Sequence, residues 1–74
     1  MNQQDMVVEY ITQFGSITPI DAFRDLGITR LSAVVFDLKE KGVNITTDIE
    51  HGKNRYGKPT RYARYSFGGN EDED

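Results

Sequence analysis

The chain has 74 residues, which is enough for one small domain. It contains no cysteine, so disulfide bonds and thiolate metal sites are excluded. No apolar run approaches the roughly 20 residues that a membrane span needs. The first residues also lack the basic start and the apolar stretch of a signal peptide, which predicts a cytoplasmic protein.

The charges are distributed unevenly along the chain. The overall net charge of −3 by itself argues against nucleic acid, because DNA-binding proteins are usually basic. Residues 1–50 carry four basic and eight acidic side chains, whereas residues 51–67 carry five basic side chains and no acid. The last seven residues add four acids. We therefore expect a strongly negative partner to bind at residues 51–67.

Apolar side chains recur at helical spacing near the start of the chain and predict a first helix over residues 3–14. Gly15 is expected to end it in the left-handed conformation. Thr18, Pro19 and Asp21 form a strong signal for the start of a second helix, over about residues 19–25. On this helix we expect the three spaced apolar residues to be buried: Ile20, Phe23 and Leu26.

After a turn around Gly27, Thr29 is expected to cap a third helix over about residues 30–41. Leu31, Val35 and Leu38 form its buried stripe, with Val34 at the margin of the stripe. Gly42 is expected to end this helix.

Beyond Gly42 the apolar period changes to two, and Val43, Ile45 and Ile49 predict a half-buried strand. A polar loop containing Gly52, Gly57 and Pro59 follows, and residues 61–67 return as a second strand. We expect the domain to occupy residues 1–67 and the acidic tail, 68–74, to be disordered.

This order of elements predicts an α+β fold of the winged helix-turn-helix type, with three helices followed by a C-terminal β-hairpin wing. In that arrangement the third helix enters the major groove of double-stranded DNA, its N-terminal end foremost. Its outward face is expected to present Arg30, Ser32, Ala33 and Phe36 to the bases. The alternative is that these residues are ordinary solvated surface.

Phe36 lies away from the predicted buried stripe and has three possible roles. It contacts a thymine methyl group, or it contacts a protein partner, or it packs under the hairpin. We favour packing.

The hairpin carries the strongest signal for a polyanionic partner. Its cations alternate with tyrosines, and we expect phosphate contacts from Lys53, Arg55, Tyr56, Lys58, Arg61 and Arg64. The alternative is that these charges only keep an exposed strand from aggregating. His51, the single histidine, cannot form an ordinary zinc site without further ligands. Without a phosphate loop, a nucleophile paired with a base, or an enclosed pair of carboxylates, we predict neither an enzyme nor a cofactor.

Several stretches carry a resemblance: GSITPIDA at 15–22, DLGITRL at 25–31, DL at 37–38, NRYG at 54–57 and RYARY at 61–65. Together they resemble the small winged helix-turn-helix proteins of phages and prophages, over about residues 4–67. The resemblance implies a DNA-binding protein with a regulatory or accessory role. Members of that family tend to have an arginine where this chain has Val34 and a small polar residue where it has Phe36.

Two hypotheses follow. In the first, the protein binds DNA through its third helix and its wing. In the second, a face formed by Val34 and Phe36 binds a protein partner, because both residues lack hydrogen-bonding groups. The acidic tail either increases solubility or folds over the wing and competes with DNA.

Overall fold

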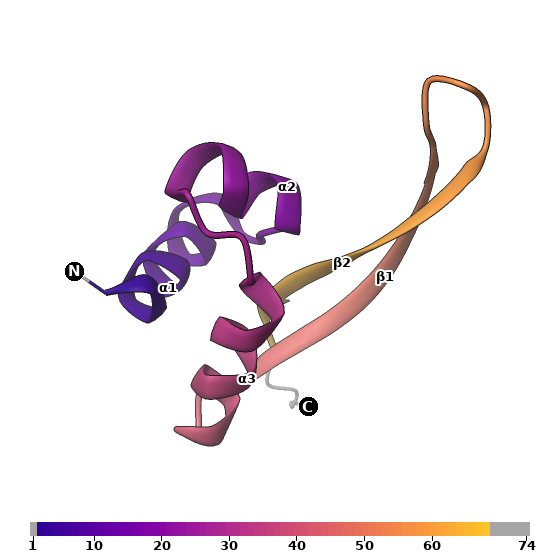
Figure 1. The fold of residues 1–74 in the computed structure, drawn as a ribbon. Helices are drawn as coiled ribbons and strands as arrows, with labels where there is room; N and C mark the ends of the chain where they lie inside the picture. The colour runs from indigo at the N-terminus through magenta and orange to yellow at the C-terminus, as the bar shows by residue number, and fades with distance from the viewer. Residues whose placement is uncertain (1, 69–74) are drawn as a thin grey trace.

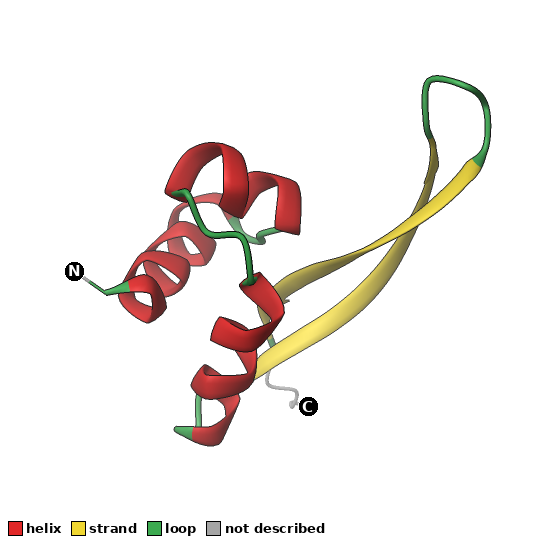
Figure 2. Cartoon of the chain, in the orientation of Figure 1, coloured by secondary structure: helices red, strands yellow, loops and turns green. Residues whose placement is uncertain are grey.

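The computed structural model describes residues 2–68, and its helices lie together at one end of a long β-hairpin (Figure 1). In chain order the elements are α1 (Gln3–Phe14), α2 (Pro19–Asp21), η1 (Ala22–Leu26), α3 (Leu31–Glu40), β1 (Ile45–Lys53) and β2 (Pro59–Phe67). Figure 2 shows the same division, with the strands extending well past the helices. The predicted disorder of the acidic tail concerns residues outside the described part of the chain, apart from Gly68.

The first helix, α1, has the predicted bounds, and the structure adds a capping residue at its start. The Asn2 side chain accepts a hydrogen bond from the Asp5 amide at 2.8 Å and caps the first turn. Gly15 adopts φ 90°, and its amide donates to the Ile11 carbonyl at 2.7 Å. The left-handed conformation, which suits glycine, therefore ends α1 after Phe14.

The second helical segment begins as predicted and then changes its winding. The Thr18 hydroxyl accepts from the Asp21 amide while the Asp21 carboxylate accepts from the Thr18 amide, forming a capping box. After one turn the chain widens into the π-helical η1, which ends at Gly27.

The prediction that Ile20 and Phe23 are buried was wrong, since their exposed fractions are 66% and 64%. Thr18 and Ala22 point inward instead. They are four residues apart and so share one side of the segment, and the small Ala22 side chain is buried in the core.

Four residues of α3 face the core, at the spacing of one helical stripe: Leu31, Val34, Val35 and Leu38. The predicted capping role of Thr29 was wrong. Arg30 occupies the N-cap position, and no side chain caps the helix there. At the other end Gly42 adopts φ 95° and turns the chain toward β1.

The two strands pair in an antiparallel register that runs from Ile45 opposite Phe67 to Lys53 opposite Pro59. The hairpin is therefore longer than predicted, because Gly52 and Pro59 lie in strands and not in the loop. Pro59 is tolerated because it is the first residue of β2. Pairing also continues past the predicted domain end, where the Gly68 amide donates to the Asn44 carbonyl at 2.8 Å.

The hairpin is fastened to the helices at its base. Ile17, in the short extended segment after α1, exchanges two backbone hydrogen bonds with Tyr65, at 2.8 and 2.9 Å. The buried core combines residues from all three helical segments and the hairpin base: Val7, Ile11, Ile17, Ala22, Ile28, Leu31, Val34, Val35, Leu38, Ile45 and Tyr65. The prediction that Ile49 is half-buried was wrong, since 56% of it is exposed. The outer part of the hairpin consequently projects beyond the core (Figure 1).

Ile17 and Ile20 provide a matched test of this core. Ile17 is fully buried, so Ile17→Ala is expected to lower the free energy of unfolding by about 2–5 kcal/mol. The same change at the exposed Ile20 is expected to alter it by no more than about 0.5 kcal/mol. Urea denaturation of both variants measures the difference, and equal losses would contradict the described burial.

Candidate nucleic-acid interface

The outward side of α3 is a mixed polar surface. As predicted, Arg30, Ser32, Ala33 and Phe36 are all exposed. Asp37, Lys39 and Glu40 continue this surface toward the C-terminal end of the helix. The first turn of α3 contains no acid, and its free amide groups have no side-chain cap. This end of the helix therefore suits an anion, because the helix dipole and Arg30 are both positive there.

Phe36 and Val34 differ in their surroundings. Phe36 is 61% exposed, so the interpretation that it packs under the hairpin was wrong. Val34 is buried and belongs to the same apolar cluster as Val7 and Ile11 of α1. Of the two residues in the predicted protein-binding face, only Phe36 is therefore exposed. Val34 packs in the core, so its lack of a hydrogen-bonding group does not affect the surface of α3.

The strand register divides the hairpin into two faces, because residues directly opposite each other point to the same side. We call the helix-side face the one formed by Ile45, Thr47, Ile49, His51, Lys53, Pro59, Arg61, Ala63, Tyr65 and Phe67. The outer face consists of Thr46, Asp48, Glu50, Gly52, Thr60, Tyr62, Arg64 and Ser66. The helix-side face adjoins α3: Ile45 and Tyr65 share its core, and Lys39 Nζ donates to Thr47 Oγ1 at 3.5 Å.

This division separates the charges of the hairpin. Lys53 and Arg61 lie on the helix-side face, which contains no acidic residue. Both acids of the paired strands, Asp48 and Glu50, lie on the outer face together with Arg64. The basic side chains of the paired strands are thus divided between the two faces of the hairpin. One face is cationic, and on the other face Asp48 and Glu50 of β1 more than balance the charge of Arg64.

Arg64 is held within the protein. Its Nε donates to Glu50 Oε2 at 2.7 Å, and a terminal guanidinium nitrogen donates to Ser16 Oγ at 2.9 Å. The hydrogen bond from Arg64 lowers the pKa of the Glu50 carboxyl, and Tyr62 adds to the effect. Arg64 therefore differs from the other four hairpin cations, which are exposed, and we assign it to the structure of the hairpin.

The tip of the hairpin is a defined loop. Asn54 Oδ1 accepts hydrogen bonds from the amides of Tyr56 and Lys58, at 2.8 and 3.1 Å. Gly57 adopts φ 78°, which glycine accommodates without strain. The loop presents three of the predicted contact residues to solvent: Arg55, Tyr56 and Lys58.

A comparison with protein-family models matches residues 2–70 to a winged helix-turn-helix domain. The chain belongs to this family. No curated protein and no solved structure matches it in the corresponding comparisons. Domains of this family typically bind DNA. The fold class predicted from the sequence is confirmed.

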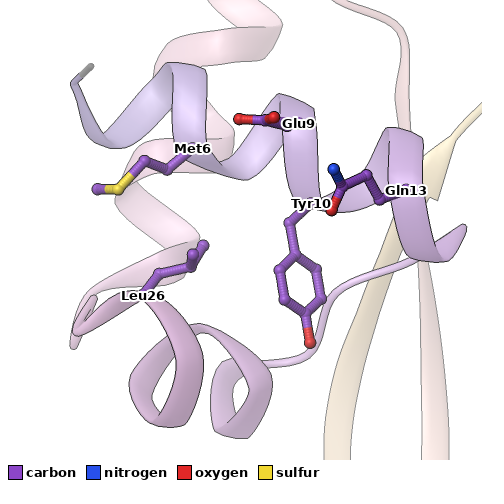
Figure 3. A pocket seen from close by; sticks show the side chains of 5 residues that line it. All are labelled: Met6, Glu9, Tyr10, Gln13 and Leu26. Carbon is purple, nitrogen blue, oxygen red and sulfur yellow. The ribbon is translucent and has the colours of Figure 1, made fainter.

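The helical part of the molecule also contains a hollow. It is open, with a volume of about 280 Å³, and lies between α1 and η1, lined by Met6, Glu9, Tyr10, Gln13 and Leu26 (Figure 3). The Tyr10 hydroxyl donates to Asp25 Oδ2 at 2.6 Å, and Asp25 also accepts from Arg24. This network ties η1 to α1, so we interpret these groups as structural.

Within residues 2–68 no three histidine, aspartate or glutamate side chains gather into a possible metal site. Over the same residues, none of the helices has both the length and the apolar character needed to cross a bilayer.

The network at Asp25 gives a pH-dependent prediction. Hydrogen bonds from Arg24 and then from Tyr10 lower the pKa of Asp25 from 3.8 to about 2. A carboxyl with a lower pKa in the folded state stabilises the fold above its ordinary pKa, and this contribution is lost as the pH falls through the folded value. The free energy of unfolding is therefore expected to fall less steeply in Asp25→Asn than in the unmodified protein between about pH 4 and pH 2.

Urea denaturation at a series of pH values measures this slope. Tyr10→Phe is expected to give an intermediate slope, because it removes one of the three hydrogen bonds that Asp25 accepts and leaves the two from Arg24. Identical slopes in the unmodified protein and in Asp25→Asn would contradict the assignment.

Proposed function

We propose that this winged helix-turn-helix protein binds double-stranded DNA through α3 and the helix-side face of the wing. The observation that carries the proposal is the separation of charge by the strand register. Lys53 and Arg61 share a face with Thr47, which Lys39 of α3 contacts, while Asp48 and Glu50 lie on the outer face. A duplex lying along this side of the molecule meets cations from both elements.

The proposed orientation of α3 follows from its two ends. A helix of ten residues is about 15 Å long and fits the major groove, which is about 12 Å wide. Arg30 and Ser32 lie at the end without acids, and Arg30 has the geometry for two hydrogen bonds to guanine. Asp37 and Glu40 lie in the C-terminal half of α3, away from the end that leads into the groove.

In this proposal the wing supplies most of the electrostatic affinity. Four exposed cations are available for phosphate contacts: Lys53, Arg55, Lys58 and Arg61. Four such contacts give a log–log dependence of affinity on salt with a slope of about −3.6. The exposed hydroxyl of Tyr56 adds a further donor at the tip.

We further propose that the protein has a regulatory or accessory role in a phage or prophage. The sequence resemblance described above supports this role. The alternative is binding of a protein partner at Phe36, favoured by the exposure of that aromatic ring. In this alternative, the affinity for the protein partner does not depend on the wing cations.

Arg61 and Arg64 form a matched pair for testing the interface, because each is an arginine of β2 and they lie on opposite faces. Arg61→Gln is expected to weaken DNA binding and to reduce the magnitude of the salt slope by about 0.9. Arg64→Gln is expected to preserve both quantities while lowering stability only slightly, since its ion pair is partly exposed to solvent. Fluorescence anisotropy with a labelled duplex over a range of salt concentrations measures the binding.

Equal losses of binding in the two variants would contradict the proposed face. A stronger test reverses three exposed charges, with Lys53, Lys58 and Arg61 all changed to glutamate. If this variant folds and retains the affinity of the unmodified protein, the nucleic-acid assignment fails.

A further inference from the structure

Phe36 occupies the middle of the outward side of α3. At 3.6 residues per turn it lies on the far side of the helix from the buried Leu31 and Leu38. Ala33 and Ser32, three and four residues earlier, are exposed on the same side. The core of the domain is formed without Phe36, so its aromatic ring contributes an apolar surface that the fold itself does not use.

Charged residues of both signs surround Phe36 on the exposed side of α3. Arg30 lies at the N-terminal end of the same helix, and Lys39 lies at the edge that contacts the wing through Thr47. The helix-side face beyond Thr47 adds Arg61 and the second exposed apolar residue of this region, Ile49. The exposed side of α3 thus places one apolar ring among two cations, Arg30 and Lys39, and two acids, Asp37 and Glu40, while the neighbouring wing supplies the excess of cations for the phosphates at the groove edges.

The chemistry of the major groove then restricts what Phe36 can recognise. Base edges there present hydrogen-bond donors and acceptors, and the C5-methyl group of thymine is the one apolar group. A phenyl ring placed over any other base edge covers polar atoms. These atoms lose their hydrogen bonds to water and gain none from the ring, which costs free energy. The acids beyond Phe36 do not conflict with this, because Asp37 and Glu40 can accept hydrogen bonds from cytosine amino groups.

We propose that Phe36 reads the thymine methyl group, so that the protein prefers thymine at the base pairs facing the middle of α3. This inference rests on the proposed binding of DNA. It assigns a base preference to one side chain, whereas Lys53, Arg55, Lys58 and Arg61 give affinity without regard to sequence.

Two duplexes of about 20 base pairs, or two helical turns, isolate the methyl group. One alternates adenine with thymine, and the other alternates adenine with uracil in deoxyribose form. They have the same charge and the same base pairing, and thymine is available in every register of the first. The unmodified protein is expected to bind the thymine duplex about three to five times more tightly, the effect of burying one methyl group.

Phe36→Ala is expected to bring this ratio close to one by weakening binding to the thymine duplex alone. Phe36→Leu, which keeps an apolar side chain, is expected to retain part of the preference. Phe23→Ala is the matched control. Phe23 has a similar exposed fraction, 64%, but lies on η1, near Asp21 and Asp25, so its removal is expected to leave the ratio unchanged. Thermal unfolding followed by circular dichroism verifies that all three variants fold.

The outcomes distinguish this inference from the function on which it rests. If both duplexes bind equally and in a salt-dependent manner, DNA binding stands and thymine reading is wrong. If Phe36→Ala keeps the full ratio, the protein senses the methyl group or the altered duplex shape elsewhere, and the inference is again wrong. If neither duplex binds in a salt-dependent manner, the proposed DNA binding fails, and Phe36 is left for a protein partner.

Discussion

The two backbone hydrogen bonds between Ile17 and Tyr65 fix the orientation of the whole hairpin relative to the helices. They hold Tyr65 with its side chain in the core, and the alternation of side chains along a strand then determines every other position of β2. Arg61 and Ala63 therefore lie on the same face of the hairpin as Tyr65, and Arg64 lies on the opposite face. A slip of one residue in the pairing would place Arg64 beside α3 and turn Arg61 outward.

The sequence was sufficient wherever structure depends on neighbouring residues. Asn2, Gly15 and the capping box at Thr18 act over three or four positions, so the ends of α1 and the start of α2 were predictable. Local patterns did not predict the exposure of Ile20 in α2 and of Phe23 in η1, nor that Arg30 takes the N-cap position expected for Thr29. The sequence alone could not predict which hairpin cations share a face, because this depends on which residues pair across the strands and on the contact with Ile17.

The outer face shows how a hairpin with little core maintains its shape. A two-stranded hairpin alone is marginally stable in water, and beyond Ile45 and Tyr65 this one buries few apolar side chains. Polar pairs across the strands take over this role. The hydroxyls of Thr46 and Ser66 lie 3.2 Å apart, and Arg64 joins Glu50 to Ser16. One of the five wing cations is thereby held in contacts within the protein.

In the proposed complex, the four exposed wing cations and the surface of α3 contribute differently to binding. The exposed surface of α3 combines Arg30 and Lys39 with Asp37 and Glu40, so this surface alone has almost no net attraction for a polyanion. In the proposed complex, the helix-side face and the tip of the wing supply that attraction and bring the helix to the groove. Once there, a surface with mixed charges and one apolar ring is suited to distinguishing bases, because it gains little from any base that it does not match. For the proposed binding of DNA, the net charge of −3 is therefore not the decisive quantity, because the duplex meets the charge of one face.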